Sequence, residues 1–278
     1  LGFIITDTAQ GPVLTTAPPF TVYDRALADG SPLAAGSRVL ISVLVSGFTA
    51  DARACIAALL EHEPSTSHIV VVDIADRDES GAWAQEVAQS HPDRVTAVHV
   101  SESADHWGRI HSDLLSRCAS DYYCVIDPST VVTGDAISRL CDVLAKQRDV
   151  VAAGWRGADV DTSDQWRSVT AVEGDADVLL SYLMVVRTEV VRAVPPDPKA
   201  RFYRNADIEW CLAIRAWHFE QVGSPTRMFA MGDALPVHQG RHHGYHDSDP
   251  DFRDRESRKT YDRILQRHRG RIDILKPR

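Results

Sequence analysis

Two kinds of apolar pattern alternate along the chain from residue 38 onward. Continuous apolar runs such as 39–45 are typical of strands buried on both faces, whereas 51–61 carries Ile56, Leu59 and Leu60 at helical spacing. The alternation predicts strands at 39–45, 68–72, 95–100 and 122–126, and helices at 51–61, 80–90, 107–116 and 134–146. This order predicts an α/β fold with a mostly parallel central sheet flanked by helices.

The two ends of the chain depart from this pattern. Residues 1–37 contain short β segments broken by glycine and proline, which predict an N-terminal β extension or linker. Three roles stay open for it: extra strands on the sheet, part of an adjoining module, or self-association, so a homo-oligomer is one prediction. Residues 136–250 are less regular, with a strand at 150–155 and a helix at 206–217. A charged helix, about 252–268, is predicted within 251–278. The predicted main domain is therefore 38–250, divided into halves at 38–135 and 136–250.

The composition limits which classes of partner, and which cellular compartment, we expect for this protein. The 278 residues are 44% hydrophobic and 25% charged, enough for a sizeable core. A net charge of −9 disfavours nucleic acid or an anionic membrane as the main partner. The five cysteines show no CxxC pair and no apolar run approaches the roughly 20 residues of a membrane span. We therefore expect a cytoplasmic protein without a transmembrane segment. Because the chain does not begin with Met, we also expect it to be a piece of a longer protein.

Two acids follow predicted strands directly. Asp73 ends the strand at 68–72 and Asp127 ends the strand at 122–126. Ligands of open α/β sheets bind beyond the carboxyl ends of the strands, where both acids are expected. Two carboxylates suit the donors of a base and a ribose, or a divalent cation on phosphates. The alternative is that both only form turns or cap helices.

Several motifs, taken in order, resemble a family 2 glycosyltransferase of the inverting GT-A type over about residues 38–245. They are Ser46-Gly47-Phe48 after the first strand, Val70-Val71-Val72-Asp73, Asp127-Pro128-Ser129 in place of Asp-x-Asp, Asn205-Ala206-Asp207-Ile208-Glu209-Trp210, and Val237-His238. The resemblance implies a nucleotide-binding fold that transfers a sugar from a nucleotide-diphosphate sugar to an acceptor hydroxyl.

The resemblance also assigns roles to residues. It places the nucleotide against Ser46, Phe48, Asp73 (at the uracil) and Asp127, and it places a divalent metal, Mn²⁺ or Mg²⁺, at Asp127, Ser129 and His238. The Asp73 assignment favours a UDP-sugar as donor. Where the family often has Ala-Arg-Asn, this chain has Ile110-His111-Ser112, and Arg109 is the predicted substitute for the missing arginine.

Asp207 is the predicted catalytic base. Transfer with inversion needs a group that takes the proton from the attacking hydroxyl, and a part-buried carboxylate can do so. The alternative is an acid that only stabilises the helix start. Glu209 and Trp210 are predicted to contact the acceptor, Trp210 as a stacking surface for a sugar.

Ser129 is the main departure from the family pattern. A hydroxyl is a much weaker ligand for a hard divalent ion than a carboxylate. Three explanations stay open: Asp127 and His238 hold the metal with waters, a basic residue such as Arg241 replaces it, or the domain does not catalyse.

Two further groups of residues resemble metal sites. His238, His242, His243 and His246 raise the alternative of a zinc site, with the nucleotide pyrophosphate or solvent as other roles for these histidines. Asp249-Pro250-Asp251 follows no strand, and we interpret it as a loop and helix cap.

The loop after the first predicted strand also distinguishes a glycosyltransferase from other nucleotide-binding enzymes. A nucleotide-sugar pyrophosphorylase would need a Gly-rich, Arg-containing loop after the first strand, and a dinucleotide oxidoreductase would need G-x-G-x-x-G there; Ser46-Gly47-Phe48-Thr49 is neither. The main alternative is a glycosyltransferase-like domain without turnover that binds or assembles. The acceptor (saccharide, lipid, peptide or small molecule) stays open.

Overall fold

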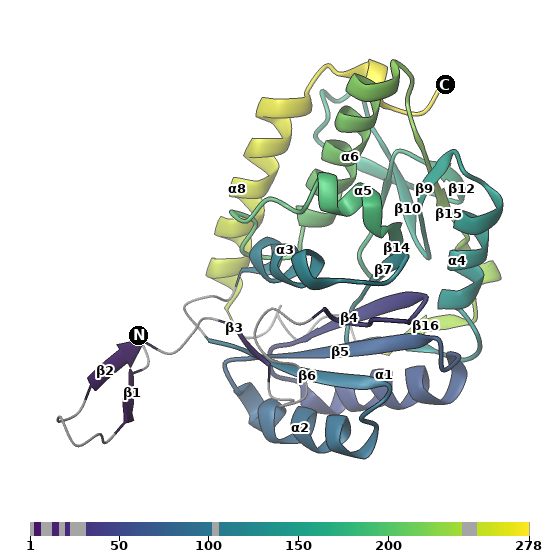
Figure 1. Ribbon diagram of the computed structural model, residues 1–278. Coiled ribbons are helices and arrows are strands. Elements are labelled where there is room, and N and C mark those ends of the chain that lie inside the picture. Colours follow the sequence, from purple (N-terminus) through teal and green to yellow (C-terminus); the bar gives the residue numbers. More distant parts are fainter. Residues whose placement is uncertain are drawn as a thin grey trace.

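The centre of the protein is a nine-stranded sheet. The computed structural model describes residues 3–6, 13–16, 20–22, 32–101, 106–240 and 249–277. Within these ranges the strand order is β12-β15-β9-β14-β7-β4-β5-β6-β3 (Figure 1). The strands are β3 (Phe20–Val22), β4 (Val39–Val45), β5 (Ser67–Ile74), β6 (Val95–Val100), β7 (Tyr122–Ile126), β9 (Val150–Gly154), β12 (Gly174–Ala176), β14 (Leu183–Arg187) and β15 (Arg227–Ala230).

The sheet is mostly parallel, as predicted. Strands β6, β5, β4 and β7 are parallel neighbours. Strand β14 is antiparallel to both β7 and β9, and β15 is parallel to β9, so β9 and β15 also run in the direction of β7. The predicted strands at 95–100 and 122–126 coincide with β6 and β7.

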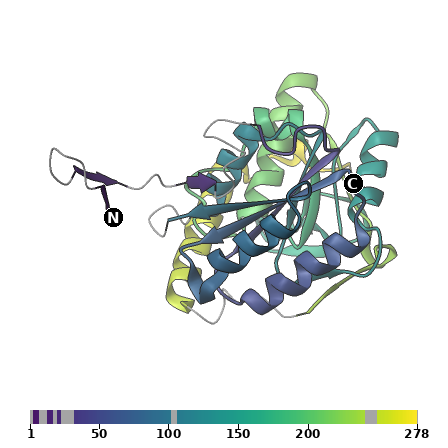
Figure 2. The same cartoon turned by 60° about the horizontal axis from the view of Figure 1, so that its bottom comes forward.

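Helices cover both faces of the sheet. One face packs against α1 (Thr49–His62), α2 (Ser80–Ser90) and α4 (Ile137–Lys146), and Figure 2 shows α1 and α2 lying across it. The other packs against α3 (Trp107–Arg117), α5 (Thr188–Ala193) and α6 (Ala206–Val222), with α8 (Pro250–His268) outside α6. Side chains of β4 alternate between the two cores, which explains its unbroken apolar run.

Smaller elements complete the described chain. Strand β10 (Gly157–Val160) pairs with β11 (Val169–Val172) and β13 (Val178–Leu179), and β8 (Thr130–Val132) pairs with β16 (Val237–Gln239). Short 3₁₀ helices lie at Arg77–Glu79, Gly232–Ala234 and Ile272–Ile274. In the described part of the chain, no helix is long and apolar enough to cross a membrane. All five cysteines are buried and unpaired.

Part of the N-terminal extension joins the central sheet. Strands β1 (Phe3–Thr6) and β2 (Val13–Thr16) form a hairpin that stands apart from the rest of the chain in both views (Figures 1 and 2). Strand β3 instead pairs antiparallel with β6 at the sheet edge. Leu33 is fully buried and bridges to Cys118. Of the three roles open for residues 1–37, extra strands on the sheet is the one confirmed, while the domain boundaries stay a prediction.

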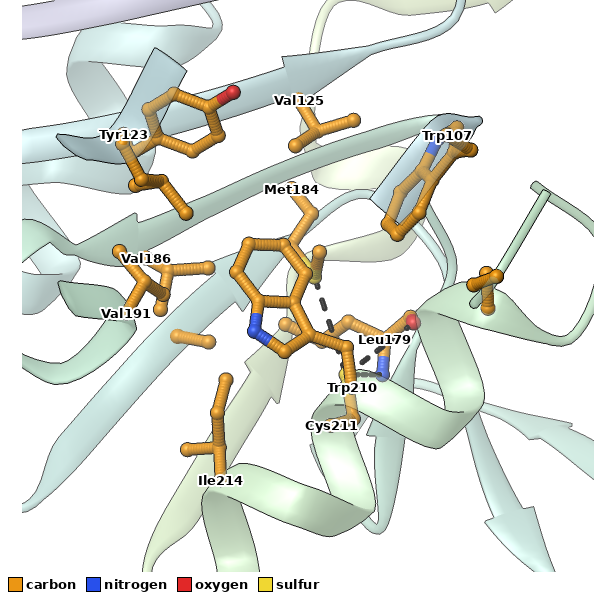
Figure 3. Close-up of a cluster of buried hydrophobic side chains, with 14 of the residues drawn as sticks. Trp107, Tyr123, Val125, Leu179, Met184, Val186, Val191, Trp210, Cys211 and Ile214 are labelled. Atoms are coloured by element: carbon orange, nitrogen blue, oxygen red, sulfur yellow. Dashed lines mark hydrogen bonds between the residues drawn. The ribbon is translucent and has the colours of Figure 1, made fainter. Parts of the chain in front are cut away.

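Trp210 fixes α6 to the sheet and does not form a sugar-stacking surface. Its indole lies in the core below Trp107 (Figure 3), with 1% of the residue exposed. Its Nε1 donates to the carbonyl of Val194 at 2.7 Å. The predicted acceptor contact of Trp210 is therefore corrected, because an enclosed indole offers no face to a sugar.

Glu209 joins α6 to α8. Its two carboxylate oxygens accept from Nε and Nη2 of Arg263, both at 2.8 Å, and Arg267 Nη1 adds a bond of 3.1 Å. Because only 2% of Glu209 is exposed, its carboxylate bonds α6 to α8 and is not accessible to an acceptor. The predicted acceptor contact of Glu209 is corrected for that reason.

Asp249 caps α8, as the sequence predicted. Its Oδ1 accepts from the backbone N–H of Phe252 at 2.9 Å, and Pro250 occupies the first turn. This arrangement satisfies an N–H group that the helix itself leaves unpaired. The start of α8 is thereby fixed, which matters because Asp249 and Phe252 also line a cavity beyond the end of β4.

Candidate functional site

A cavity of about 660 Å³ lies beyond the carboxyl ends of β4 and β5. This volume is typical of small-molecule sites, and the position is the expected one for a ligand of an open α/β sheet. Its walls come from five segments far apart in the sequence. The lining residues are Leu44, Ser46, Gly47, Phe48, Ile74, Arg77, Asp78, Trp107, Arg201, Phe202, Tyr203, Asp249 and Phe252.

The loop after β4 is held in a fixed shape. Phe48 has a φ of 53°, in the left-handed region that a bulky side chain rarely adopts. Next to it, Thr49 donates its N–H to Asp78 Oδ2 at 3.2 Å and its hydroxyl to the Asp78 carbonyl at 2.8 Å. Arg77 Nη1 donates to the hydroxyl of Ser46. Ser46 and Phe48, both predicted nucleotide ligands, thus lie together on the cavity wall.

Asp73 lies at the strand end but inside the protein. It is fully buried, its Oδ1 accepts from the hydroxyl of Ser80, and its Oδ2 is 2.7 Å from Nδ1 of His99. Asp73 is not among the residues that line the cavity. Its contact with a uracil stays a prediction, and the geometry shows that such a contact would compete with Ser80 and His99.

Arg109 does not reach the cavity. Its side chain is 48% exposed on α3 and its Nε lies 3.8 Å from Asp113. Where the family often has arginine, this chain has His111, whose side chain is buried with its Nδ1 2.7 Å from the Tyr123 hydroxyl. Burial lowers the pKa of His111 to about 3, so this residue is neutral and supplies no positive charge. The prediction that Arg109 replaces the missing arginine is corrected, since the side chain points to solvent.

Two other arginines, which the sequence analysis missed, place charge in the cavity. Arg77 and Arg201 both line it. The guanidinium of Arg201 lies over the ring of Phe252, 5.1 Å from its centroid, and its buried Nε has no hydrogen-bond partner among the described residues. Neither arginine follows a recognisable motif, so no local sequence signal could have found them.

Asp127 and Ser129 form a closed turn at the end of β7. The N–H and hydroxyl of Ser129 donate to Asp127 Oδ1 at 2.9 and 2.5 Å. Gln239 Nε2 donates to the Ser129 hydroxyl at 3.3 Å, and Ser129 is only 4% exposed. The structure therefore uses Ser129 to hold the Asp127 carboxylate, where the family pattern has a second acid.

The residues in this region do not fit a tightly held divalent metal. His238 is exposed on β16. Within the described ranges, no group of three or more His, Cys, Asp or Glu side chains is placed to hold a metal ion. Hard divalent ions favour several oxygen ligands, and Asp127 is the one carboxylate of the predicted set. Arg241, His242, His243 and His246 lie outside the described residues.

Asp207 occupies the first turn of α6. Its Oδ2 accepts from the N–H and hydroxyl of Ser181 at 2.9 and 3.2 Å, and its Oδ1 accepts from the Ile208 N–H at 2.8 Å. Burial raises the pKa of Asp207 above its ordinary range, because the desolvation of the carboxylate outweighs these bonds. The N-cap position of α6 is Asn205, whose side chain makes no capping bond, and the bond from the first-turn N–H of Ile208 means that Asp207 also stabilises the start of the helix.

One turn contacts both acidic residues. Ser181 donates to the Asp207 carboxylate, and the carbonyl oxygen of the following Tyr182 accepts a hydrogen bond from the backbone N–H of Asp127 at 3.1 Å. Burial, followed by the nearby charges of Asp207 and Asp127, raises the pKa of Tyr182. Two acidic residues from distant segments thus contact one short turn at the carboxyl edge of the sheet.

Fold and site define the class of protein. A mixed sheet with a parallel half, a ligand-sized cavity at its carboxyl edge and acids at the end of β5, after β7 and in the first turn of α6 make a GT-A nucleotide-binding fold. Residues 49–202, more than half of the chain, match the family model described as glycosyl transferase family 2. The chain belongs to this family. Among curated proteins, none is similar enough in sequence to count as a relative.

Solved structures with the same fold are distant in sequence. A mannosyltransferase from Pyrobaculum calidifontis, in complex with GDP-Man and Mn²⁺, has 16% identity and a TM-score of 0.58, over 84% of this chain and 72% of that one. GalNAc-T7 with UDP, GalNAc and Mn²⁺ has 11% identity and a TM-score of 0.63, over 82% of this chain and 48% of its own. S. aureus TarS 1-349 with UDP-GlcNAc has 12% identity and a TM-score of 0.57, over 82% and 66%. The chain therefore spans less than half of the GalNAc-T7 chain.

Proposed function

We propose that this protein transfers a sugar, with inversion, from a nucleotide-diphosphate sugar to an acceptor hydroxyl, and that the donor is a UDP-sugar. The observation that carries the proposal is that Asp127, through its backbone, and Asp207, through its carboxylate, are both bonded to the Ser181-Tyr182 turn at the carboxyl edge of a family 2 fold. Two of the similar solved structures contain UDP or UDP-GlcNAc, which supports this choice of donor.

Asp207 is the proposed base. Inversion requires one carboxylate to accept the proton from the acceptor hydroxyl as that oxygen attacks the anomeric carbon. Burial gives Asp207 a raised pKa, and a stronger base results because a poorly solvated carboxylate gains more on protonation. The hydrogen bonds from Ser181 and Ile208 hold the carboxylate in one orientation, which favours attack from a single direction.

The departing nucleoside diphosphate needs positive charge. Arg77 and Arg201 face the cavity, and guanidinium groups bind phosphate oxygens with charge-assisted hydrogen bonds. We assign the diphosphate to these two arginines. We assign the uracil of the nucleotide to the cavity wall formed by Ser46 and Phe48. Similar solved structures contain Mn²⁺. Among the predicted metal ligands, Asp127 is the carboxylate that would hold Mn²⁺ or Mg²⁺. A bound ion would add to the positive charge that the two arginines supply.

The second candidate is a domain that binds nucleotide without turnover. The observation that favours it is the residue at position 129. Ser129 stands where the family has a second acid, and its hydroxyl donates a hydrogen bond to Asp127. Both candidates require a nucleotide site, so binding alone does not separate them.

Titration calorimetry tests the site and an NMR assay tests turnover. UDP, GDP, TDP and CDP are titrated into the protein with Mn²⁺ and with chelator, and then into Asp127→Ala and the control Arg271→Ala, whose residue does not line the cavity beside β4. Tightest binding of UDP that Asp127→Ala weakens and Arg271→Ala leaves unchanged supports the donor site. Absence of any nucleotide binding refutes both candidates.

Proton NMR of the matching sugar nucleotide then measures release of UDP and the anomeric configuration of the product. A β-configured product from an α-linked donor supports inversion, and retention refutes it. Binding without any release, with a panel of acceptors, favours the binding domain.

A further inference from the structure

The loop between β5 and α2 has a left-handed backbone over most of its length. Ala75, Asp76, Asp78 and Glu79 have φ values of 50–61°. None of them is glycine, so each carries a Cβ that disfavours this region of φ. A single residue of this kind is common in a turn, whereas a run of them is not. Contacts from other segments must therefore stabilise the loop in this shape.

The middle of the loop is bonded to the start of α1. Thr49, the first residue of α1, donates its N–H to Asp78 Oδ2 at 3.2 Å and its hydroxyl to the Asp78 carbonyl at 2.8 Å. One residue thus contacts both the side chain and the backbone of Asp78. Thr49 is buried, so water competes little for these bonds. The two bonds hold Asp78 at a φ that its own Cβ disfavours.

The two ends of the loop are anchored separately. The N–H of Ala75 donates to the carbonyl of Val100 at 2.8 Å, and Asp76 Oδ1 accepts from the N–H of Gly81 at 2.9 Å. These bonds fix the loop where it leaves β5 and where it enters α2. The contact with Thr49 therefore acts mainly on the segment between them, residues 77–79.

Arg77 is the residue whose position depends on this segment. It lines the cavity beside β4, and its Nη1 donates to the Ser46 hydroxyl. A guanidinium has five N–H donors, so a bond to Ser46 is compatible with contacts to phosphate oxygens. If a neighbouring residue relaxed to the ordinary right-handed region, its φ would change by about 120° and would carry the Arg77 side chain out of its present position.

The Asp78 carboxylate is not a suitable ligand for the donor itself. Asp78 lines the cavity, but its negative charge repels a diphosphate. Its Oδ2 instead accepts the Thr49 N–H at the N-terminus of α1, where the helix dipole stabilises a carboxylate. An effect through Arg77 is therefore more consistent with the geometry than a direct contact.

We propose that Thr49 and Asp78 are positioning residues for the donor. Their two bonds hold the left-handed loop, and the loop in turn holds Arg77 where the diphosphate of the nucleotide sugar binds. The inference rests on the proposed function, because it concerns the diphosphate site of that reaction. It adds that the affinity of the site is set by a strained loop that touches the diphosphate through Arg77.

Titration calorimetry with UDP and uridine tests the proposal. Thr49→Val removes the hydroxyl with almost no change in shape, and UDP binding should weaken about fivefold to tenfold because the loop is released. Binding of uridine, which has no phosphate, should stay unchanged. In an Arg77→Ala background, Thr49→Val should have almost no further effect on UDP, because both changes act through the same guanidinium.

A rescue experiment tests the strain directly. Ala75→Gly removes one unfavourable Cβ and should return the UDP affinity of Thr49→Val to within about twofold of the wild type. The matched control is Ala82→Gly, at an exposed position inside α2, which should rescue nothing. Introduced alone, Ala75→Gly should raise the melting temperature by about 2–4 °C and Ala82→Gly should lower it by a similar amount.

Each outcome decides the assignment. Unchanged UDP affinity in Thr49→Val overturns the positioning role, and so does an equal loss of UDP and uridine binding. An equal effect of Thr49→Val with and without Arg77, or a failure of Ala75→Gly to restore UDP binding, also overturns it. A wild-type protein that binds no nucleotide refutes the donor site and this role together, whereas wild-type UDP binding that Thr49→Val leaves unchanged refutes the positioning role alone.

Discussion

Two acids in one helical turn should respond in opposite ways to the same kind of substitution. Asp207 and Glu209 both lie at the start of α6 and both are more than nine-tenths buried. Asp207 is bonded by neutral donors, whereas Glu209 is paired with Arg263 and Arg267. Replacing each acid by its amide, Asp207→Asn and Glu209→Gln, removes the charge with almost no change in shape.

Asp207→Asn should abolish turnover with little change in the stability of the fold. The folded state raises the pKa of Asp207, so the stability that protonation provides is present at low pH and is lost as the pH rises through that raised pKa. At neutral pH the ionised carboxylate therefore costs stability. An amide avoids this cost, but its NH₂ group must face the N–H of either Ser181 or Ile208, which offsets the gain. Because the two effects oppose each other, we expect the melting temperature to change by less than about 4 °C in either direction. We expect kcat to fall about 10²–10⁴-fold, the usual contribution of a general base, equivalent to about 3–5 kcal/mol.

Glu209→Gln should do the reverse. The amide leaves Arg263, whose side chain is 15% exposed, with the more distant Asp197 carboxylate at 3.7 Å as a charged partner, and breaking a buried ion pair in this way typically costs about 3 kcal/mol. For a chain of this size that corresponds to a melting temperature lower by about 6–12 °C. Turnover per folded molecule should change little, because Glu209 faces α8.

Differential scanning calorimetry and a nucleotide-release assay measure both variants at several pH values. In the wild type, kcat/KM should fall on acidification through the raised pKa of Asp207, because the base must be ionised. A stable, fully active Asp207→Asn would refute the assignment of the base. An Asp207→Asn variant that melts as low as Glu209→Gln would show that Asp207 is structural.

Three further variants test separate parts of the structure. Arg201→Ala should weaken UDP binding about tenfold or more by calorimetry while leaving uridine binding unchanged, because the guanidinium is expected to contact phosphate; equal losses for both ligands would contradict this. Ser129→Asp supplies a second carboxylate beside Asp127 and should make UDP binding more dependent on Mn²⁺; identical affinities with Mn²⁺ and chelator would oppose the idea that Ser129 limits metal binding. Asp249→Ala removes the α8 cap and should lower the melting temperature by about 2–4 °C, from a loss of about 1 kcal/mol, and an unchanged value would count against the cap.

The order of elements followed from the sequence because burial on both faces leaves a strong local signal. Strands such as 122–126 are continuous apolar runs, and the acid that ends such a run marks the carboxyl edge of a parallel sheet. The cap at Asp249 was equally local, since the residue, the proline after it and the helix lie within a few positions.

The direction of side chains on α6 could not be predicted in the same way. This helix lies between the sheet and α8, so polar and apolar residues are buried on several sides and the helical period marks no solvent face. Trp210 therefore turned inward to the core and Glu209 outward to α8, although the sequence predicted both at the acceptor.

The sequence by itself determined the alternating elements, the acids that follow them and the family to which they point. Only the tertiary structure decided which side chains share a cavity. Arg201 and Phe252 are brought together by the packing of α8 on α6, and Trp155 and Tyr182 by two neighbouring segments at the sheet edge. Such contacts join residues distant along the chain, and no local pattern encodes them, because packing energy depends on the surfaces that meet and not on their order in the sequence.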